Sequence, residues 1–177
     1  MDDLFERGFR TKNGSIRTPQ SIQSYATLAT IIFQTNQNEQ HGGQAIPAFD
    51  FFMAKGVSKS FRKHLSSFIS FYVAMESNTA VEEKAIRALI EEHLPSIKTS
   101  EVERETLRMA LTALQINIDK EHLARIIEKA YFQTRKDTHQ AMEGFIHNLN
   151  TMHSRGGNQV VFSSINYGTD TSTEGRM

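Results

Sequence analysis

Residues 162–172, which read FSSINYGTDTS, mark the point where the character of the sequence changes. The chain before this stretch is dominated by amphipathic helical patterns separated by capping signals. Here an apolar run that starts at Val160 leads into a group of small hydroxyl, amide and carboxylate side chains. We interpret the stretch as a strand that brings polar groups to its carboxyl end, where α/β proteins place their ligands.

Two segments share one order of elements, in which a helix is followed by Gly-Gly and an apolar extended run. They read HGGQAI (residues 41–46) and RGGNQVVF (residues 155–162). Helices that alternate with buried strands are typical of α/β sheets and barrels. Pro47 restricts the first run to an edge strand or a buried turn. We therefore expect a helix-rich α/β chain with only two or three short strands, too few for a closed sheet.

The last residues of the chain predict the start of another helix. Thr171-Ser172-Thr173-Glu174 is a capping box, and only three residues follow Glu174. So short a helix does not form alone, because nucleation costs more than the first hydrogen bonds return. We expect the 177 residues to be an internal piece of a larger protein, forming a single partial domain.

Capping residues predict the first helices. Thr18 as N-cap and Pro19 at the first helical position indicate a helix to about residue 40. Its expected buried stripe is Ile22, Ala26, Ala29 and Phe33, widened by Leu28, Ile31 and Ile32. Asp50 is expected to cap a short helix that Gly56 closes, and Ser58 or Ser60 to start the next. The stripe of that next helix comprises Phe61, Leu65, Phe68, Ile69, Tyr72 and Val73.

Two capping boxes, Thr79 with Glu82 and Ser100 with Glu103, predict two further helices. Their expected stripes are Val81, Ala85, Ile86, Leu89 and Ile90, and then Val102, Thr106, Met109, Ala110 and Ala113. Asp119 caps the last and longest pattern. That pattern carries Leu123, Ile126, Ile127, Ala130, Ala141, Phe145, Leu149 and Met152. A fresh capping signal at residues 137–140 predicts either a kink or two helices that meet there.

Composition excludes several classes of function. The formal net charge is zero, so we expect no general attraction to nucleic acid or to an anionic membrane. No apolar run is long enough to span a bilayer, and the first residues lack the pattern of a signal peptide, which makes a cytoplasmic location the expectation. The sequence has no cysteine, which excludes a disulfide, a thiolate metal site and a cysteine nucleophile within it.

No catalytic motif stands out from the residues alone. His139, His147 and His153 lack the i, i+4 spacing of a helical metal site, so we expect no metal. The Gly-Gly turns lack the lysine and the following helix of a phosphate loop. A basic cluster, residues 55–64, is either a solvated face or a phosphate contact. The residues between 9 and 18 form either a solvated hairpin or loop around Asn13-Gly14, or an anion-binding loop.

Two blocks of the sequence resemble a known family. Residues 41–50 (HGGQAIPAFD) and residues 140–155 (QAMEGFIHNLNTMHSR), the latter continued by residues 159–177, resemble the anaerobic (class III, glycyl-radical) ribonucleoside-triphosphate reductases. Ala45, Val161 and Thr173 stand where relatives tend to have serine, proline and proline. None of these differences removes a group that the chemistry needs.

The resemblance implies part of a ten-stranded α/β barrel that reduces ribonucleoside triphosphates to deoxyribonucleoside triphosphates. It implies a glycyl radical, a barrel cysteine that forms a thiyl radical, formate as reductant and a structural zinc, all outside this chain. The partners that it implies are allosteric nucleotides, a radical-SAM activating enzyme and the rest of the reductase chain. It also implies that the complete enzyme is a homodimer. On this interpretation the chain is inactive alone.

Residues that match the family's blocks give the candidate sites. Ser163, Ser164, Asn166 and Tyr167 are expected to line the substrate cavity. The segment around the first helix start resembles the family's effector region at its dimer interface, and its candidate residues are Lys12, Asn13, Gly14, Ser15, Arg17 and Gln20. We assign no catalytic residue. The alternative hypothesis is a non-catalytic helical module that binds nucleotides or other proteins and derives from the same scaffold.

Overall fold

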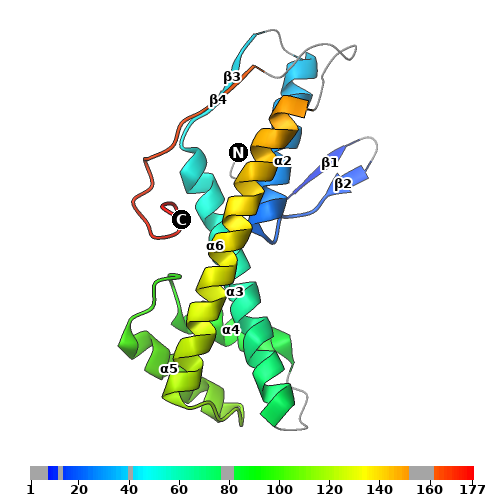
Figure 1. The fold of residues 1–177 in the computed structure, drawn as a ribbon. Coiled ribbons are helices and arrows are strands. Elements are labelled where there is room, and N and C mark those ends of the chain that lie inside the picture. Colours follow the sequence, from blue (N-terminus) through cyan, green and yellow to red (C-terminus); the bar gives the residue numbers. More distant parts are fainter. Residues whose placement is uncertain (1–7, 12–13, 40–41, 77–81, 152–161) are drawn as a thin grey trace. The chain divides into compact units, whose positions relative to one another are not determined.

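The computed structural model describes residues 8–11, 14–39, 42–76, 82–151 and 162–177 (Figure 1). Its elements are β1 (Phe9–Thr11), β2 (Gly14–Ile16), α2 (Ile22–Glu39), β3 (Gln44–Ile46), α3 (Phe49–Glu76), α4 (Glu83–His93), α5 (Glu101–Ala113), α6 (Lys120–Thr151) and β4 (Ser163–Ile165). The predicted helix-rich character is confirmed, whereas the ten-stranded barrel stays a prediction. Among these residues, no helix is both long and apolar enough to cross a membrane.

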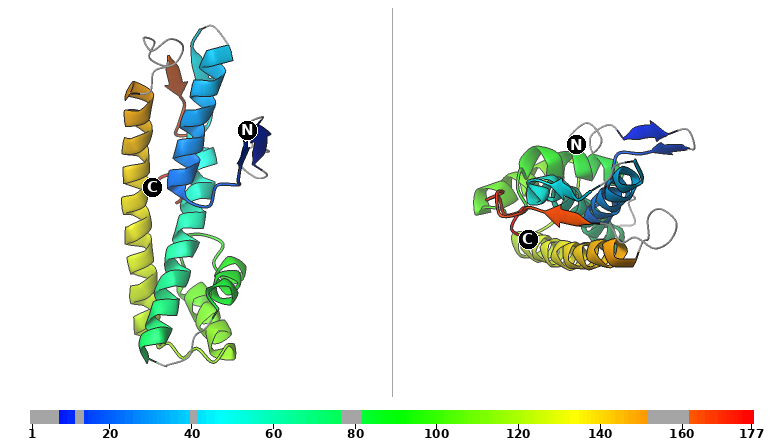
Figure 2. Two further views of the ribbon diagram at one scale, coloured as in Figure 1. Left: turned by 90° about the vertical axis from the view of Figure 1, so that its right-hand side faces the viewer. Right: turned by 90° about the horizontal axis from the view of Figure 1, so that it is seen from above.

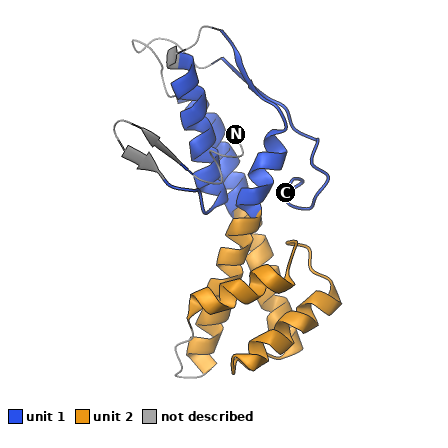
Figure 3. Cartoon of the chain, turned by 180° about the vertical axis from the view of Figure 1, so that it is seen from behind, with its two compact units in different colours: residues 1–57, 137–177 blue, residues 58–136 orange. Residues whose placement is uncertain are grey.

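The chain forms two compact units (Figure 3). Unit 1 comprises residues 1–57 and 137–177, and unit 2 comprises residues 58–136. Helices α3 and α6 each contribute one part to unit 1 and one part to unit 2. The single partial domain expected from the sequence stays a prediction.

The core of unit 1 lies between three helical stretches. In this unit α2 lies beside the first turns of α3 and the second half of α6 (Figure 2). The ring centroid of Phe145 is 6.3 Å from that of Phe33 and 5.0 Å from that of Phe49. The predicted stripe of α2 is confirmed, since its four central residues, Ile22, Ala26, Ala29 and Phe33, are all buried.

A parallel pair of strands, β3 and β4, joins the two chain segments that make up unit 1. Gln44 of β3 lies opposite Ser163 of β4, and Ile46 lies opposite Ile165. Residues 44–46 therefore form a strand at the edge of a two-stranded sheet, which confirms the first of the two alternatives. Pro47 follows the last pair, so its missing N–H removes no bond of the ladder.

Strand β4 begins later than the apolar pattern indicates. Val160 and Val161 lie outside the described residues, and Phe162, directly before the strand, is 75% exposed. The ladder falls on Ser163–Ile165. The polar residues singled out from the sequence therefore lie within the strand as well as at its end.

Helix α2 starts three residues after the Thr18-Pro19 dipeptide that was expected to begin it, so that expectation was wrong. The Ser24 N–H donates to the Ser21 hydroxyl oxygen (3.3 Å), and the Tyr25 N–H donates to the Ser21 carbonyl (3.0 Å). Ser21 is thus the N-cap, because its hydroxyl satisfies a backbone donor of the first turn that no helical carbonyl can reach.

Helix α3 is continuous through Gly56, where the sequence indicated an end and a new start at Ser58 or Ser60. The glycine is required by packing instead of by a turn. A Cβ atom at position 56 would lie 2.9 Å from the Tyr25 Cγ and 3.1 Å from the Ile22 Cα. The absence of a side chain therefore lets α2 and α3 approach closely.

Helix α6 is likewise a single helix across residues 137–140, so the predicted pair of helices was wrong. Its buried residues recur every three or four positions through this region and include Ala130, Thr134, Thr138, Ala141 and Phe145. The Thr134 hydroxyl donates to the Ala130 carbonyl (2.7 Å), which satisfies the hydroxyl within the helix. One uninterrupted buried stripe outweighs a local capping signal.

The caps of unit 2 follow the sequence in two of three cases. The Ser100–Glu103 capping box is present in both directions, and the Asp119 carboxylate accepts the His122 N–H (2.8 Å). Helix α4, however, has Glu82 as its N-cap without a side-chain bond, whereas Thr79 lies outside the described residues. The predicted capping box placed Glu82 in the first turn of the helix, which was wrong because Glu82 is the N-cap.

The buried stripe of α5 differs from the predicted one. Leu107 and Leu111 are fully buried, whereas Val102 is 75% exposed and Met109 is 57% exposed. Two leucines at i and i+4 bury more apolar surface than the alanine- and threonine-rich face that was predicted. In α3, the predicted stripe around Phe61, Leu65 and Ile69 is confirmed.

The C-terminal capping signal produces one turn. The Gly175 N–H donates to the Ser172 hydroxyl oxygen (3.0 Å), and the Arg176 N–H donates to the Ser172 carbonyl (3.2 Å). Ser172 therefore caps this turn in place of Thr171, the first residue of the predicted capping box, and residues 172–177 form no helix, so the predicted helix start was wrong.

Replacing Gly56 with Ala should destabilise unit 1. Alanine in a helix interior is normally better than glycine by about 1 kcal/mol. At position 56 the new methyl group would meet Tyr25 and the backbone of Ile22, so we expect a net loss of about 1–3 kcal/mol. Gly144→Ala in α6 is the matched control, since nothing lies within 4 Å of its Cβ position. Denaturant unfolding that finds both variants stabilised would contradict this packing.

Candidate functional site

The strand-end segment of unit 1, residues 162–170, carries all four residues predicted to bind substrate. Ser163 and Ser164 lie in β4, and Asn166 and Tyr167 follow it. All four are exposed, and Tyr167 is 77% exposed. The structure gives none of these four side chains a hydrogen-bond partner within the described part of the chain. Their hydroxyl and amide groups are therefore available to a ligand.

The backbone of this segment is hydrogen-bonded, although the side chains of Ser163, Ser164, Asn166 and Tyr167 have no hydrogen-bond partner among the described residues. The Asn166 N–H donates to the Ile46 carbonyl (3.1 Å), and the Phe49 N–H donates to the Asn166 carbonyl (2.7 Å). Both backbone groups of Asn166 are thus bonded to the chain between β3 and α3. This arrangement fixes the position of the Asn166 backbone from which its side chain extends.

A buried carboxylate, that of Asp50, holds the next residues of the segment. Its Oδ2 accepts the backbone N–H groups of Gly168 (2.7 Å) and Asp170 (2.9 Å). Its Oδ1 accepts the Thr169 hydroxyl (3.1 Å) and the N–H of Phe51 (3.0 Å) in the first turn of α3. The sequence predicted Asp50 as a helix N-cap, which was wrong because α3 begins one residue earlier, at Phe49, and the sequence contained no signal for the distant partners.

The electrostatics of Asp50 follow from these donors. Burial raises the pKa of the carboxyl group, but hydrogen bonds from Asp170, Gly168, Thr169 and Phe51 outweigh that effect and lower the pKa from 3.8 to about 2. Asp50 is therefore ionised at neutral pH despite being only 8% exposed. Hydrogen bonds to the charged form are the cause of the net shift.

Two glycines allow the loop to reach Asp50. Gly168 has a φ of 93°, a backbone conformation that residues with a Cβ rarely adopt. A Cβ atom at Gly175 would lie 2.5 Å from the Asp170 carboxyl carbon, so the C-terminal turn packs directly on the loop. The Asp170 carboxylate in turn accepts the Ser172 N–H (2.8 Å).

A mainly apolar cavity of about 290 Å³ lies beside the strand-end segment within unit 1. It is formed by the start of α3, the second half of α6, β4 and the C-terminal turn. Its lining includes Phe49, Asp50, Met53, Phe145, Ile165, Tyr167 and Met177. The Thr138 hydroxyl contacts the Met177 sulfur at 3.7 Å and closes one side of the cavity.

The candidate effector residues are only partly described. β1 and β2 form an antiparallel hairpin with Phe9 opposite Ile16, which confirms the predicted hairpin, whereas Lys12 and Asn13 lie outside the described residues. Gly14 and Ser15 belong to β2. Arg17 and Gln20 line one open cavity of about 890 Å³ along the start of α2. The remaining lining combines polar residues (Thr18, Ser21, Gln23, Ser24 and Thr27) with apolar ones (Pro19, Leu28 and Ile31).

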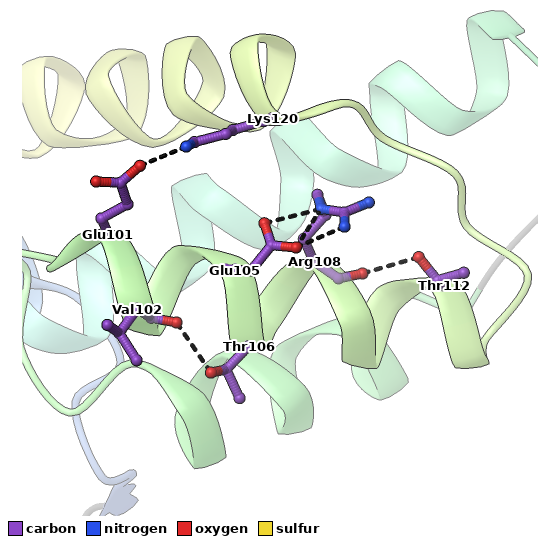
Figure 4. Close-up of polar contacts among 7 residues, drawn as sticks. All are labelled: Glu101, Val102, Glu105, Thr106, Arg108, Thr112 and Lys120. Carbon is purple, nitrogen blue, oxygen red and sulfur yellow. Dashed lines mark hydrogen bonds and ion pairs between the residues drawn. The ribbon is translucent and has the colours of Figure 1, made fainter.

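The charged side chains of unit 2 include several oppositely charged pairs. Lys120 bonds to Glu101, and Arg108 forms a two-pronged contact with Glu105, beside a cavity of about 280 Å³ in unit 2 (Figure 4). In the basic cluster, Arg62 lies 3.8 Å from Glu91. Among the described residues, no group of three or more histidine, cysteine or acidic side chains is arranged to hold a metal ion.

The ionised state of Asp50 predicts a pH-dependent stability. Its charge stabilises the fold above the unfolded pKa near 3.8, and this contribution is lost as the pH falls toward the folded pKa of about 2. The difference corresponds to about 2 kcal/mol. Asp50→Asn should therefore reduce the free energy of unfolding at pH 7, and the deficit relative to wild type should shrink below about pH 4. A deficit that is constant with pH would contradict a charged Asp50.

Comparison with known proteins places these observations in a family. No protein with a curated description matches the chain. A family model described as anaerobic ribonucleoside-triphosphate reductase matches residues 1–177, which is the whole chain. This match confirms the resemblance carried by residues 41–50 and 140–177, the two blocks that the β3–β4 pair and Asp50 bring together in unit 1. The chain belongs to the anaerobic ribonucleoside-triphosphate reductase family.

Proposed function

We propose that the chain contributes part of the substrate-binding wall to an enzyme that reduces ribonucleoside triphosphates to deoxyribonucleoside triphosphates. The family match over the whole chain supports this reaction class. The strand-end segment supports the site, because it combines a fixed backbone with exposed polar side chains. In this proposal, the hydroxyls of Ser163 and Ser164 and the amide of Asn166 bond to ribose or phosphate oxygens. The Tyr167 ring and hydroxyl extend the same surface.

The radical chemistry implied by the family needs groups that these 177 residues do not encode. A thiyl radical requires a cysteine, and the sequence has none. In the proposed enzyme, the cysteines, the glycyl radical and the structural zinc lie in polypeptide outside these residues, and formate supplies the reducing electrons. The role of this chain is therefore to bind and orient the nucleotide. A radical-SAM activating enzyme, a dimer partner and a cytoplasmic location belong to the same proposal.

The effector role is proposed for residues 12–20. A triphosphate needs cations and backbone donors, and the cavity at the start of α2 offers Arg17, the Gln20 amide and several hydroxyls. Lys12, Asn13, Gly14 and Ser15 complete the proposed site from the hairpin. The Ser24 N–H is already bonded to Ser21, so the charge of Arg17 and Lys12 has to provide most of the attraction.

One observation favours a second candidate function, a non-catalytic module that binds nucleotides or other proteins. The sequence lacks every cysteine that turnover would need. A module of this kind would unfold cooperatively as a monodisperse protein when purified. Aggregation, or a state that binds hydrophobic dyes without fixed side-chain packing, would instead favour a part of a larger barrel.

Titration of the full chain with ribonucleoside triphosphates tests the substrate site. We expect Asn166→Ala to weaken binding about tenfold, since each lost hydrogen bond to a ligand is worth about 1.4 kcal/mol. Asn150→Ala, which removes another exposed amide of unit 1, is the control and should leave the affinity unchanged. Equal affinities for wild type and Asn166→Ala would remove Asn166 from the site.

The effector proposal predicts a change in the binding of a second triphosphate that is independent of the substrate site. Changing Lys12 and Arg17 together to Ala should weaken the binding of a second triphosphate by about 1–2 kcal/mol through the loss of two charged contacts. The binding that depends on Asn166 should stay the same. Calorimetry that resolves two classes of site in wild type and one in the double variant would agree with this proposal. Two unchanged classes would exclude Lys12 and Arg17.

A further inference from the structure

Asp50 lies in α3, about 120 positions before the residues that it binds, yet three of its four hydrogen bonds go to the strand-end segment. The separations in sequence are 118, 119 and 120 residues. The fourth bond, from the Phe51 N–H, ties the carboxylate to the first turn of α3. Each oxygen accepts two donors, so the acceptor capacity of the group is filled.

The chemistry of these contacts requires a carboxylate. All four partners are donors, and three of them are backbone N–H groups. An asparagine at this position would offer one oxygen and one NH₂ group, and the NH₂ would face donors. A buried donor without an acceptor costs about 1–3 kcal/mol, so this change would loosen the loop as well as lose the bonds.

The bonds of Asp50 lie directly beside the proposed substrate groups. Asn166 is held at its backbone N–H by Ile46, the last residue of β3, and at its carbonyl by Phe49, the first residue of α3. Gly168, two positions later, is held by Asp50. Tyr167 therefore lies between two fixed points of backbone, although its side chain is 77% exposed and free of hydrogen bonds in the described structure.

We propose that Asp50 is a positioning residue for the nucleotide, which it does not touch: it fixes the backbone of Gly168–Asp170 and so orients Tyr167, whose other neighbour, Asn166, is held by Ile46 and Phe49. This inference rests on the proposed function of the strand-end segment. It assigns to residues 44–50 the task of shaping the site that residues 162–170 present. A fixed backbone lowers the entropy that the segment loses when it binds a ligand.

Amide hydrogen exchange on the full chain tests the structural half of the inference. In Asp50→Asn the amides of Gly168 and Asp170 should exchange at least about tenfold faster than in wild type. The Asn166 amide, which bonds to Ile46 instead, should change less. Asp119→Asn is the matched control, because Asp119 also accepts a backbone N–H at a helix start but lies in unit 2. Unchanged exchange at Gly168 and Asp170 would overturn the inference.

A double-mutant cycle with adenosine, guanosine, cytidine and uridine triphosphates tests the functional half. Asp50→Asn should weaken the binding of the preferred nucleotide about tenfold, and Asp119→Asn should not. Adding Asp50→Asn to an Asn166→Ala, Tyr167→Ala background should have little further effect, since the groups that Asp50 orients are gone. If the role of Asp50 is purely structural, Asp50→Asn should weaken binding equally in both backgrounds, and that result would overturn the inference.

The outcomes separate this inference from the proposed function. If the wild-type chain binds none of the four triphosphates, the proposed function fails and the inference fails with it. If Asn166→Ala weakens binding and Asp50→Asn does not, the inference alone is overturned. Should Asp50→Asn fail to fold, Thr169→Val removes a single bond to the same carboxylate and should produce a smaller loss of affinity in the same direction. An unchanged affinity in Thr169→Val would then decide against the inference.

Discussion

The buried Asp50 carboxylate accepts four hydrogen bonds and fixes the backbone at the end of the strand-end segment, residues 168–170. A charged group that loses its water is costly by several kcal/mol unless other donors replace the hydration shell. At Asp50 those donors come from two places, the first turn of α3 and the backbone of Gly168–Asp170. The loop supplies two N–H groups to the same oxygen, and the positive φ of Gly168 accompanies this geometry. The charge of Asp50 and the conformation of the loop therefore depend on each other.

The parallel pair of β3 and β4 extends this dependence to the whole of unit 1. Most of the residues between the two strands belong to α3, α4, α5 and α6, so the pair closes a long loop. The entropy of loop closure grows only with the logarithm of length, and each doubling costs about 0.6 kcal/mol. A helical insertion such as unit 2 is therefore compatible with a short pair of strands. The Phe145 ring, packed between Phe33 and Phe49, adds apolar burial next to the same strands.

The sequence predicted features that depend on neighbouring residues and missed those that depend on distant ones. The Ser100–Glu103 box and the stripe of α2 were found because capping and periodicity are local. Gly56 was interpreted as a helix end, since only the approach of Tyr25 shows why a glycine is needed there. The partners of Asp50 were missed for the same reason. The four strand-end residues were singled out by the change of pattern at residues 162–172 and assigned to a substrate site through the family resemblance. The structure adds that the backbone around them is hydrogen-bonded to β3 and α3.

Exposure alone does not make the strand-end segment a site, because exposed polar groups are satisfied by water. Its distinguishing feature is the contrast between a backbone bonded at Asn166, Gly168 and Asp170 and the side chains of the four candidate residues, which have no hydrogen-bond partner in the described structure. Sites that bind with precision hold their contact groups on rigid elements of the fold. Radical intermediates also require a site closed to water. On the proposed function, the segment, with Tyr167 77% exposed, supplies one wall of such a site, and the opposing wall carries the cysteines that this sequence lacks.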